Sequence, residues 1–233
     1  MFIPKDESPK FDPCPAGTHM ARCFRFVDLG SHEQKFQGES KGLKRLVMLS
    51  FEIPGELMED GRPFTISKRY TWSMHEKSTL RKHLEAWRGR KFQDNEFGPG
   101  GFDIRNVIGK VCTISVVHKE NTEGDIFANI DSIGAPIKGI EIPAQINPSG
   151  YVALDRAFFQ KADYDALSDK LKEFIQQSPE WRRLSEAPVT KTYAEARGTP
   201  RDDPARDMSI EGVHYDEMTP PPPTEDELEA FLG

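Results

Sequence analysis

The sequence predicts a mainly β body with flanking helices, followed by an acidic tail that stays disordered. Three observations support this fold class. Five segments rich in β-branched and aromatic residues are separated by glycine, proline and asparagine turns. One segment between the third and the fourth has helical periodicity, and the composition changes after Ser185, where large apolar residues become few.

The charge of the chain is divided unequally. The net charge of the 233 residues is -7, but Glu186 to Gly233 alone holds 12 acidic and 4 basic residues. Thr18 to Lys119 holds 18 basic and 12 acidic residues, so a mildly basic body precedes a negative tail. We therefore expect residues 1–139 to form a β domain, residues 140–185 a helical extension packed on or near it, and residues 186–233 the disordered tail.

Three strands are predicted first. Thr18 to Leu29 is aromatic and β-branched and is followed by Gly30, after which Ser31 to Lys41 is expected to be a polar loop. Leu43 to Ile53 ends at Pro54-Gly55, and Pro63 to Trp72 follows the turn signal Glu59-Asp60-Gly61.

A helix is predicted next, over Glu76 to Arg88. Ser73 and Glu76 have the spacing of a capping box, and Gly89 supplies the stop. Three apolar residues fall on one face of this helix, namely Leu80, Leu84 and Trp87.

Two further strands are predicted, at Asn106 to Lys119 and at Asp125 to Ile133. Three strands, one helix and two strands is the element order of an OB-fold, a small barrel whose surface and loops bind oligonucleotides. A C-terminal helical arm follows, with an amphipathic helix over Ala162 to Gln177 and a last turn begun by Ser178-Pro179-Glu180. The arm can pack on the barrel or mediate self-association, so we expect a monomer or weak dimer.

Several classes of protein are disfavoured. No run approaches the roughly 20 apolar residues of a membrane span, and the first residues lack the apolar segment of a signal peptide, so a soluble intracellular protein is expected. Cys14, Cys23 and Cys112 are odd in number and widely spaced, which favours buried free thiols. The six histidines lack metal-ligand spacing, and the GPGG loop lacks the lysine of a phosphate-binding loop. No cofactor, no metal and no enzymatic activity are expected.

A general binder of single strands needs basic side chains along a groove and aromatic rings on which bases stack. The strands carry this mixture. Alternation places Arg22, Phe24 and Phe26 on one face of the first strand and Lys68, Tyr70 and Trp72 on one face of the third. The predicted DNA-binding residues are Arg22, Phe24, Phe26, Lys44, Arg45, Lys68, Tyr70, Trp72 and Phe127.

Each of these residues has a plainer interpretation. A ring in a strand is often a core residue, and a charged residue in a strand is often on a solvated face. Asp94, Glu96 and Asp103 could also hold a metal for nuclease chemistry, which is the enzymatic alternative.

The phrases HEKSTLRKHLEAWRGR (75–90) and NVIGKVC (106–112) resemble a family of bacteriophage single-stranded DNA-binding proteins of replication modules. The resemblance covers roughly Phe11 to Gly139. It implies an OB-fold that coats single-stranded DNA without sequence preference during replication or recombination, in the cytoplasm of the infected bacterial host. A protein-interaction adaptor or an annealing mediator of the same replication complex is the alternative function.

The end of the chain resembles the acidic tails of single-strand binders, which recruit replication or recombination proteins. A proline spacer precedes acidic residues and then apolar ones. The residues expected to bind such partners are Glu225, Asp226, Glu227, Leu228 and Phe231. We also expect the tail to screen the DNA groove, since it imitates a polyanion. Solubilising disorder is the plainer interpretation.

Overall fold

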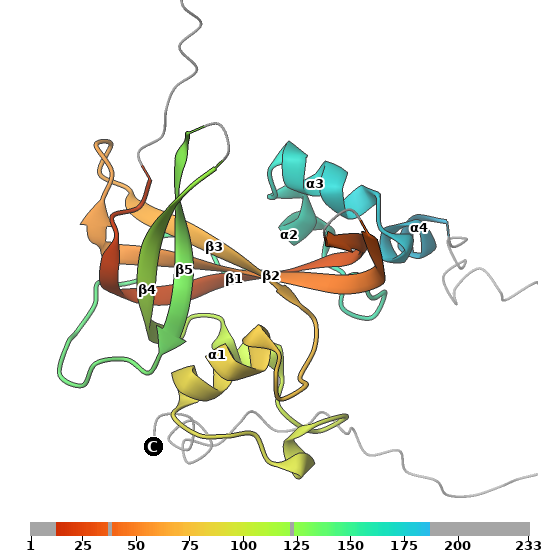
Figure 1. Cartoon of the computed structure of the whole chain (residues 1–233), viewed down its shortest axis with the longest axis horizontal. Coiled ribbons are helices and arrows are strands. Elements are labelled where there is room, and N and C mark those ends of the chain that lie inside the picture. Colours follow the sequence, from red (N-terminus) through yellow and green to blue (C-terminus); the bar gives the residue numbers. More distant parts are fainter. Residues whose placement is uncertain (1–12, 37–38, 122–123, 187–233) are drawn as a thin grey trace, which may run out of the picture. The chain divides into compact units, whose positions relative to one another are not determined.

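The computed structural model describes residues 13–36, 39–121 and 124–186 (Figure 1). The chain divides into two units, Met1–Ser185 and Glu186–Gly233, and the description below concerns the first. The tail residues predicted to bind partners lie outside the described residues. The first unit is mainly β, with one sheet and a few short helices, as predicted.

One sheet with the strand order β3-β2-β1-β4-β5 forms the body. Its strands are β1 (Gly17–Phe36), β2 (Glu39–Leu57), β3 (Pro63–Thr71), β4 (Val111–Glu120) and β5 (Ile126–Gly134). The pairs along this order are antiparallel. The short β6 (Gly150–Val152) pairs in parallel with β1, along the stretch of β1 that follows its pairing with β4.

The sheet is not closed into a barrel. Among the described residues, β3 and β5 are the two edges of the strand order and no ladder joins them. The Lys68 ammonium crosses from β3 and donates a hydrogen bond to the carbonyl of Ile130 in β5. The closed barrel expected of an OB-fold is therefore not confirmed, and we call this gap between β3 and β5 the seam.

The hairpin of β1 and β2 is longer than predicted. Of the residues expected to form a loop, those at 31–36 continue β1 and those at 39–41 continue β2, and backbone pairing resumes after irregularities in register. Gly30, interpreted as a strand end, lies inside β1 with a φ of 78°. A glycine adopts this conformation without the steric cost of a side chain, so the strand bends at Gly30 and does not stop.

Helix α1 (Thr79–Arg88) begins three residues later than predicted. The cap is Ser78, whose Oγ accepts a hydrogen bond from the Arg81 amide at 3.3 Å, and not Ser73. The predicted end at Gly89 is confirmed by its φ of 71°. The predicted apolar face is also confirmed, because Leu80, Leu84 and Trp87 are buried.

The segment between α1 and β4 contains two 3-10 turns, η1 (Asp94–Glu96) and η2 (Ile104–Val107). The fourth strand was predicted to begin at Asn106 but begins at Val111. The Asp103 carboxylate accepts a hydrogen bond from the Arg105 amide at 2.8 Å and so caps η2 in place of strand.

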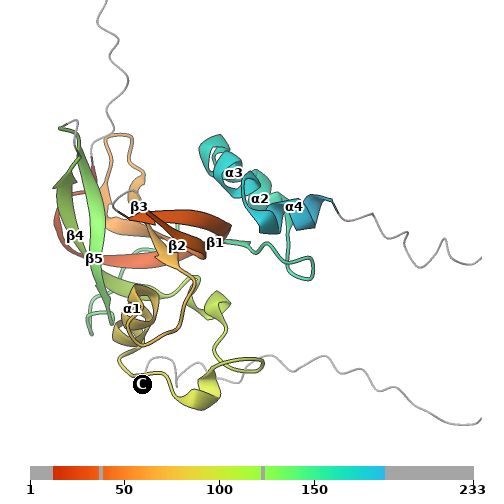
Figure 2. The ribbon, with the colours of Figure 1, turned by 45° about the vertical axis from the view of Figure 1, so that its right-hand side comes forward.

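The helical arm consists of three short helices, α2 (Lys161–Asp165), α3 (Asp169–Gln176) and α4 (Pro179–Ser185). The single helix predicted over this region is interrupted between α2 and α3. The start of α4 at Pro179 is confirmed, and the Ser178 hydroxyl accepts a hydrogen bond from the Trp181 amide at 3.2 Å. Figure 2 shows the arm on the opposite side of the β1–β2 hairpin from α1.

Two hydrophobic clusters share this hairpin. The sheet core lies between the strands and α1 and includes Phe51, Ile114 and Trp87. The arm core lies between the hairpin and α2–α4, where Val27 and Leu29 of β1 contact a second set of buried residues. The members of this second set are Leu46, Val152, Leu154, Tyr164, Leu167 and Ile175. The arm thus packs on the sheet through its own core.

The three cysteines are free and buried. Burial raises the pKa of Cys14 to about 11 and that of Cys23 to about 12. Burial also holds the pKa of Cys112 well above its usual value. No helix in the described part of the chain is long and apolar enough to cross a membrane.

Candidate nucleic-acid interface

Three of the predicted stacking rings are buried. Phe24 is 5% exposed, and Phe26 and Tyr70 are each 3% exposed. Phe26 and Tyr70 belong to the sheet core, and a register shift between Cys23 and Arg25 breaks the alternation that placed Phe24 beside Phe26. These rings offer no free face to a base, so we remove them from the candidate interface.

Arg22 has a structural role. Its side chain is 13% exposed, lies 3.7 Å from the Glu52 carboxylate and donates a hydrogen bond of 2.8 Å to the carbonyl of Pro143. Glu52 is fully buried and accepts hydrogen bonds from the amides of Ile146 and Asn147. Arg22 and Glu52 together fasten the segment after β5 to the sheet.

Two of the predicted rings remain accessible. Trp72 is 41% exposed and Phe127 is 42% exposed. Trp72 directly follows β3, and its amide donates to the Arg45 carbonyl at 2.8 Å. Phe127 lies opposite Lys119 in the β4–β5 ladder, so the Phe127 ring and the Lys119 side chain lie on the same face of the sheet.

The two basic residues at the start of the predicted second strand differ in whether another side chain holds them in place. Lys44 is exposed. Arg45 is held by the buried Asp28 carboxylate, to which it donates from both Nε and Nη2. Asp28 also accepts from the amides of Gly30 and Leu154, at 3.0 Å and 3.2 Å. Arg45 is therefore a fixed cation, with 39% of its side chain exposed.

Lys68 lies at the seam, where a second cation approaches it. Burial lowers the pKa of Lys68, and the nearby Lys119 lowers it further, against the opposing effect of Asp131. The seam therefore brings Lys68 and Lys119 together with the exposed Phe127, although these residues are far apart in the sequence.

Beneath the seam, the Tyr70 hydroxyl and His83 Nδ1 lie 3.1 Å apart. Burial and the Lys68 charge lower the pKa of His83 to about 4. His83 is accordingly neutral near pH 7, so it contributes no positive charge at the seam.

The sequence did not predict a group of side chains that we call the aromatic strip. It consists of four rings and one guanidinium, those of Trp72, Phe26, Tyr151, Phe158 and Arg105. Phe26 contacts Trp72 edge to face at 5.8 Å and stacks on Tyr151 at 5.4 Å. The Arg105 guanidinium lies 5.9 Å from the Tyr151 ring and 5.4 Å from the Phe158 ring. Only Trp72 in this strip was both predicted and accessible. No sequence pattern links it to Tyr151 and Phe158, which lie in segments that follow the predicted strands.

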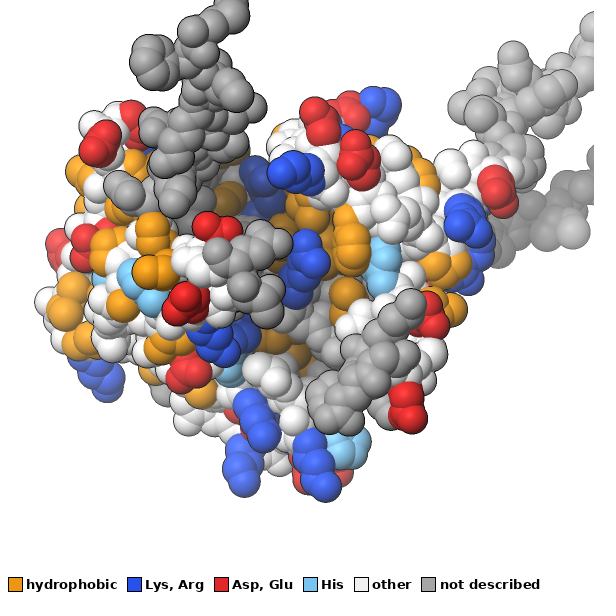
Figure 3. All heavy atoms as spheres, turned by 45° about the horizontal axis from the view of Figure 1, so that its top comes forward, with side chains coloured by type: hydrophobic (Ala, Val, Ile, Leu, Met, Phe, Trp, Pro, Cys, Tyr) orange, Lys and Arg blue, Asp and Glu red, His pale blue; other side chains and the backbone are white. Residues whose placement is uncertain are grey.

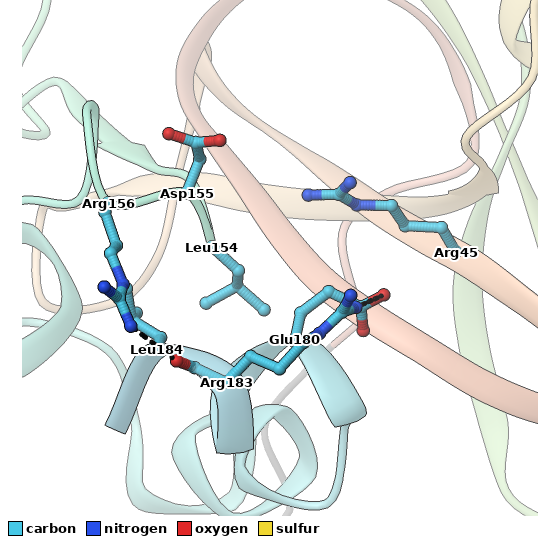
Figure 4. A pocket seen from close by; sticks show the side chains of 7 residues that line it. All are labelled: Arg45, Leu154, Asp155, Arg156, Glu180, Arg183 and Leu184. Atoms are coloured by element: carbon cyan, nitrogen blue, oxygen red, sulfur yellow. Dashed lines mark hydrogen bonds and ion pairs between the residues drawn. The ribbon is translucent and has the colours of Figure 1, made fainter. Parts of the chain in front are cut away.

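A pocket of about 290 Å³ lies where the hairpin meets the arm (Figure 4). Arg45, Arg156 and Arg183 line it together with Asp155, Glu180, Leu154 and Leu184. Glu180 is already engaged by the amide and hydroxyl of Ser31, at 2.7 Å and 2.8 Å. Three guanidinium groups against two carboxylates leave little net charge, so the pocket alone does not favour a phosphate.

The space-filling view in Figure 3 shows lysine and arginine side chains beside hydrophobic ones around a hollow between the sheet and the arm. Two contacts bridge the sheet and α3. The Phe174 ring stacks on His32 at 3.8 Å, and the Arg69 guanidinium lies 4.8 Å from the same ring. This face therefore combines cations with apolar surface.

Two of the three carboxylates considered for nuclease chemistry, those of Glu96 and Asp103, are engaged by arginines. Glu96 accepts from Arg88 and Arg90, and Asp103 accepts from Arg105. Within residues 13–36, 39–121 and 124–186, no group of histidine, cysteine or carboxylate side chains is arranged to hold a metal.

No protein-family model matches the chain, and no curated protein sequence matches it.

Proposed function

We propose that the body of this protein binds single-stranded DNA without sequence preference. The observation that carries the proposal is the pairing of exposed rings with cations. Phe127 lies opposite Lys119 in the β4–β5 ladder, and the Trp72 amide donates a hydrogen bond to the carbonyl of Arg45 across β2 and β3. Unpaired bases stack on such rings while the ammonium and guanidinium groups neutralise phosphates.

The order of elements supports the proposal, because three strands, a helix and two strands is the OB-fold order. We infer an OB-fold whose edges β3 and β5 approach each other at the seam. The resemblance of residues 75–90 and 106–112 to phage single-strand binders supports a role in phage DNA replication or recombination, in the host cytoplasm. Annealing of strands is the neighbouring function, and a protein-interaction adaptor is the competing one.

We further propose that the tail recruits replication or recombination proteins through Glu225, Asp226, Glu227, Leu228 and Phe231. An acidic run followed by apolar residues suits a basic-rimmed pocket on a partner. The same run competes with DNA for the cationic body. Deletion of residues 224–233 is expected to tighten DNA binding at low salt, and an unchanged or weaker affinity would remove the competition.

Titration of labelled oligo(dT) with the full chain at several salt concentrations tests the proposal. We expect affinity to fall with salt, with a slope of about -0.7 for each phosphate contacted. Duplex DNA of the same length is the control and should bind much more weakly, because paired bases cannot stack on protein rings. A protein that ignores oligo(dT) even in dilute buffer would be an adaptor, and the proposal would fail.

A further inference from the structure

We propose that the aromatic strip is a nucleobase-stacking site and that residues outside the five main strands complete it. Tyr151 belongs to β6, Phe158 to the segment before the arm helices, and Arg105 to η2. This inference rests on the proposed single-stranded DNA binding, and it names the residues that take the bases at one place.

The strip is continuous. Trp72 and Phe158 are its exposed ends, and Phe26, Tyr151 and Arg105 join them through four successive contacts of 5.4 to 5.9 Å between ring centroids or from guanidinium to ring. Phe26 is buried and supports its neighbours from below. A strand laid along the strip would meet Trp72, Tyr151 and Phe158.

Phe158 is exposed but firmly placed. Phe158 is 48% exposed. The preceding turn is fixed by Asp155, whose carbonyl accepts from the amides of Phe158 and Phe159 at 3.1 Å and 2.8 Å. The Asp155 carboxylate also accepts from the Ala157 amide at 2.9 Å. Because the turn already fixes the backbone that carries the ring, no backbone entropy is lost at this position when a ligand binds.

Charge distinguishes the strip from the seam. Arg105, the cation of the strip, is paired with Asp103, to which it donates from Nε at 2.8 Å. The strip therefore carries rings and a planar guanidinium with little net charge, whereas at the seam two lysines, Lys68 and Lys119, stand against one carboxylate, that of Asp131. Bases are the part of single-stranded DNA that a nearly neutral aromatic surface recognises, so stacking should dominate here.

The test compares Phe158→Ala with the wild type, both as full chains, by anisotropy of labelled oligo(dT) across a salt series. Loss of one stacked base is expected to weaken binding about 5- to 150-fold. The salt slope should not change, because no phosphate contact is removed. Phe158→Trp should restore binding, since it restores a ring.

Ile140→Ala is the matched control. Ile140 is 50% exposed and also lies in a connecting segment, but it is not part of the strip. The affinity of the Ile140→Ala variant for oligo(dT) should equal that of the wild type. Melting curves of the variants check that Phe158→Ala remains folded.

Three outcomes would overturn the inference. If Phe158→Ala binds oligo(dT) like the wild type, the strip is not a base site, while the proposed function stands. If Phe158→Ala and Ile140→Ala weaken binding equally, the loss is not specific to the strip. If the wild type does not bind oligo(dT), the proposed function itself fails. In that case the strip would be assigned to a protein partner if the wild type binds a proline-rich peptide and Phe158→Ala does not.

Discussion

Ser178, the residue that caps α4, lies directly against Gly30 of β1. A Cβ atom added at Gly30 would lie 2.3 Å from both Cβ and Oγ of Ser178. The close approach and the φ of 78° both require glycine at this position. The contact joins the arm to the hairpin at the point where β1 bends.

Replacing Gly30 with alanine should destabilise the body strongly. The backbone conformation costs about 1–2 kcal/mol for a residue with a side chain, and overpacking against Ser178 adds about 1–3 kcal/mol. Gly42→Ala is the matched control, because Gly42 has the same φ of 78° but open space around it. Urea unfolding of both variants measures the difference. Equal losses would show that α4 does not approach Gly30 closely.

Removing the Glu52 carboxylate should also destabilise the body. Glu52 is fully buried and accepts from the Ile146 amide and from both the amide and side chain of Asn147. Glu52→Ala leaves these donors and Arg22 without their partner, at a cost of about 3–5 kcal/mol. The exposed Glu59 supplies the control, since Glu59→Ala should change the free energy of unfolding by less than about 0.5 kcal/mol. Comparable effects of the two variants would contradict this role of Glu52.

His83 should make the stability depend on pH. Its pKa is about 4 in the folded protein and 6.5 as a model value, so folding favours the neutral ring. The stabilisation is complete above pH 6.5 and is lost as the pH falls towards 4, because the unfolded chain binds the proton more tightly. Thermal melts of His83→Gln should show a smaller loss over this range. The exposed His75 provides the control variant His75→Gln, whose profile should follow the wild type.

Trp72 should report DNA binding. The chain has three tryptophans, and Trp87 is 4% exposed while Trp181 stacks on Tyr164 at 4.4 Å. Trp72 is 41% exposed, so bases should reach its ring most readily. Oligo(dT) should quench tryptophan fluorescence in the wild type. In Trp72→Phe the quenching should disappear while anisotropy still reports binding. Undiminished quenching in this variant would place the bases elsewhere.

The sequence predicted the order of the five main strands and the helix between them. Leu80, Leu84 and Trp87 were placed correctly because helical periodicity is a local signal. The start of α1 was misplaced because Ser73 and Ser78 both satisfy the local capping rule. Gly30 was misinterpreted as a stop because glycine marks both strand ends and bends, and only the pairing of β1 with β2 distinguishes them.

The candidate site was predicted less well, for a physical reason. Alternation correctly placed Lys68 and Tyr70 on one face, but it cannot say which face is buried. The charge of Lys68 suggested the outer face, whereas its ammonium crosses the seam to a carbonyl of β5. Arg105 and Phe158 meet through contacts between residues far apart in the chain, and such contacts leave no periodic pattern.

The hairpin of β1 and β2 lies in both hydrophobic clusters, which limits where the protein can be shortened. A fragment ending at Gly139, the predicted domain boundary, would leave Val27, Leu29 and Leu46 uncovered and prone to aggregate. A fragment ending at Ser185 keeps both clusters intact. Expression trials and NMR samples of the body should therefore stop after α4, and the arm should melt together with the sheet as one cooperative unit.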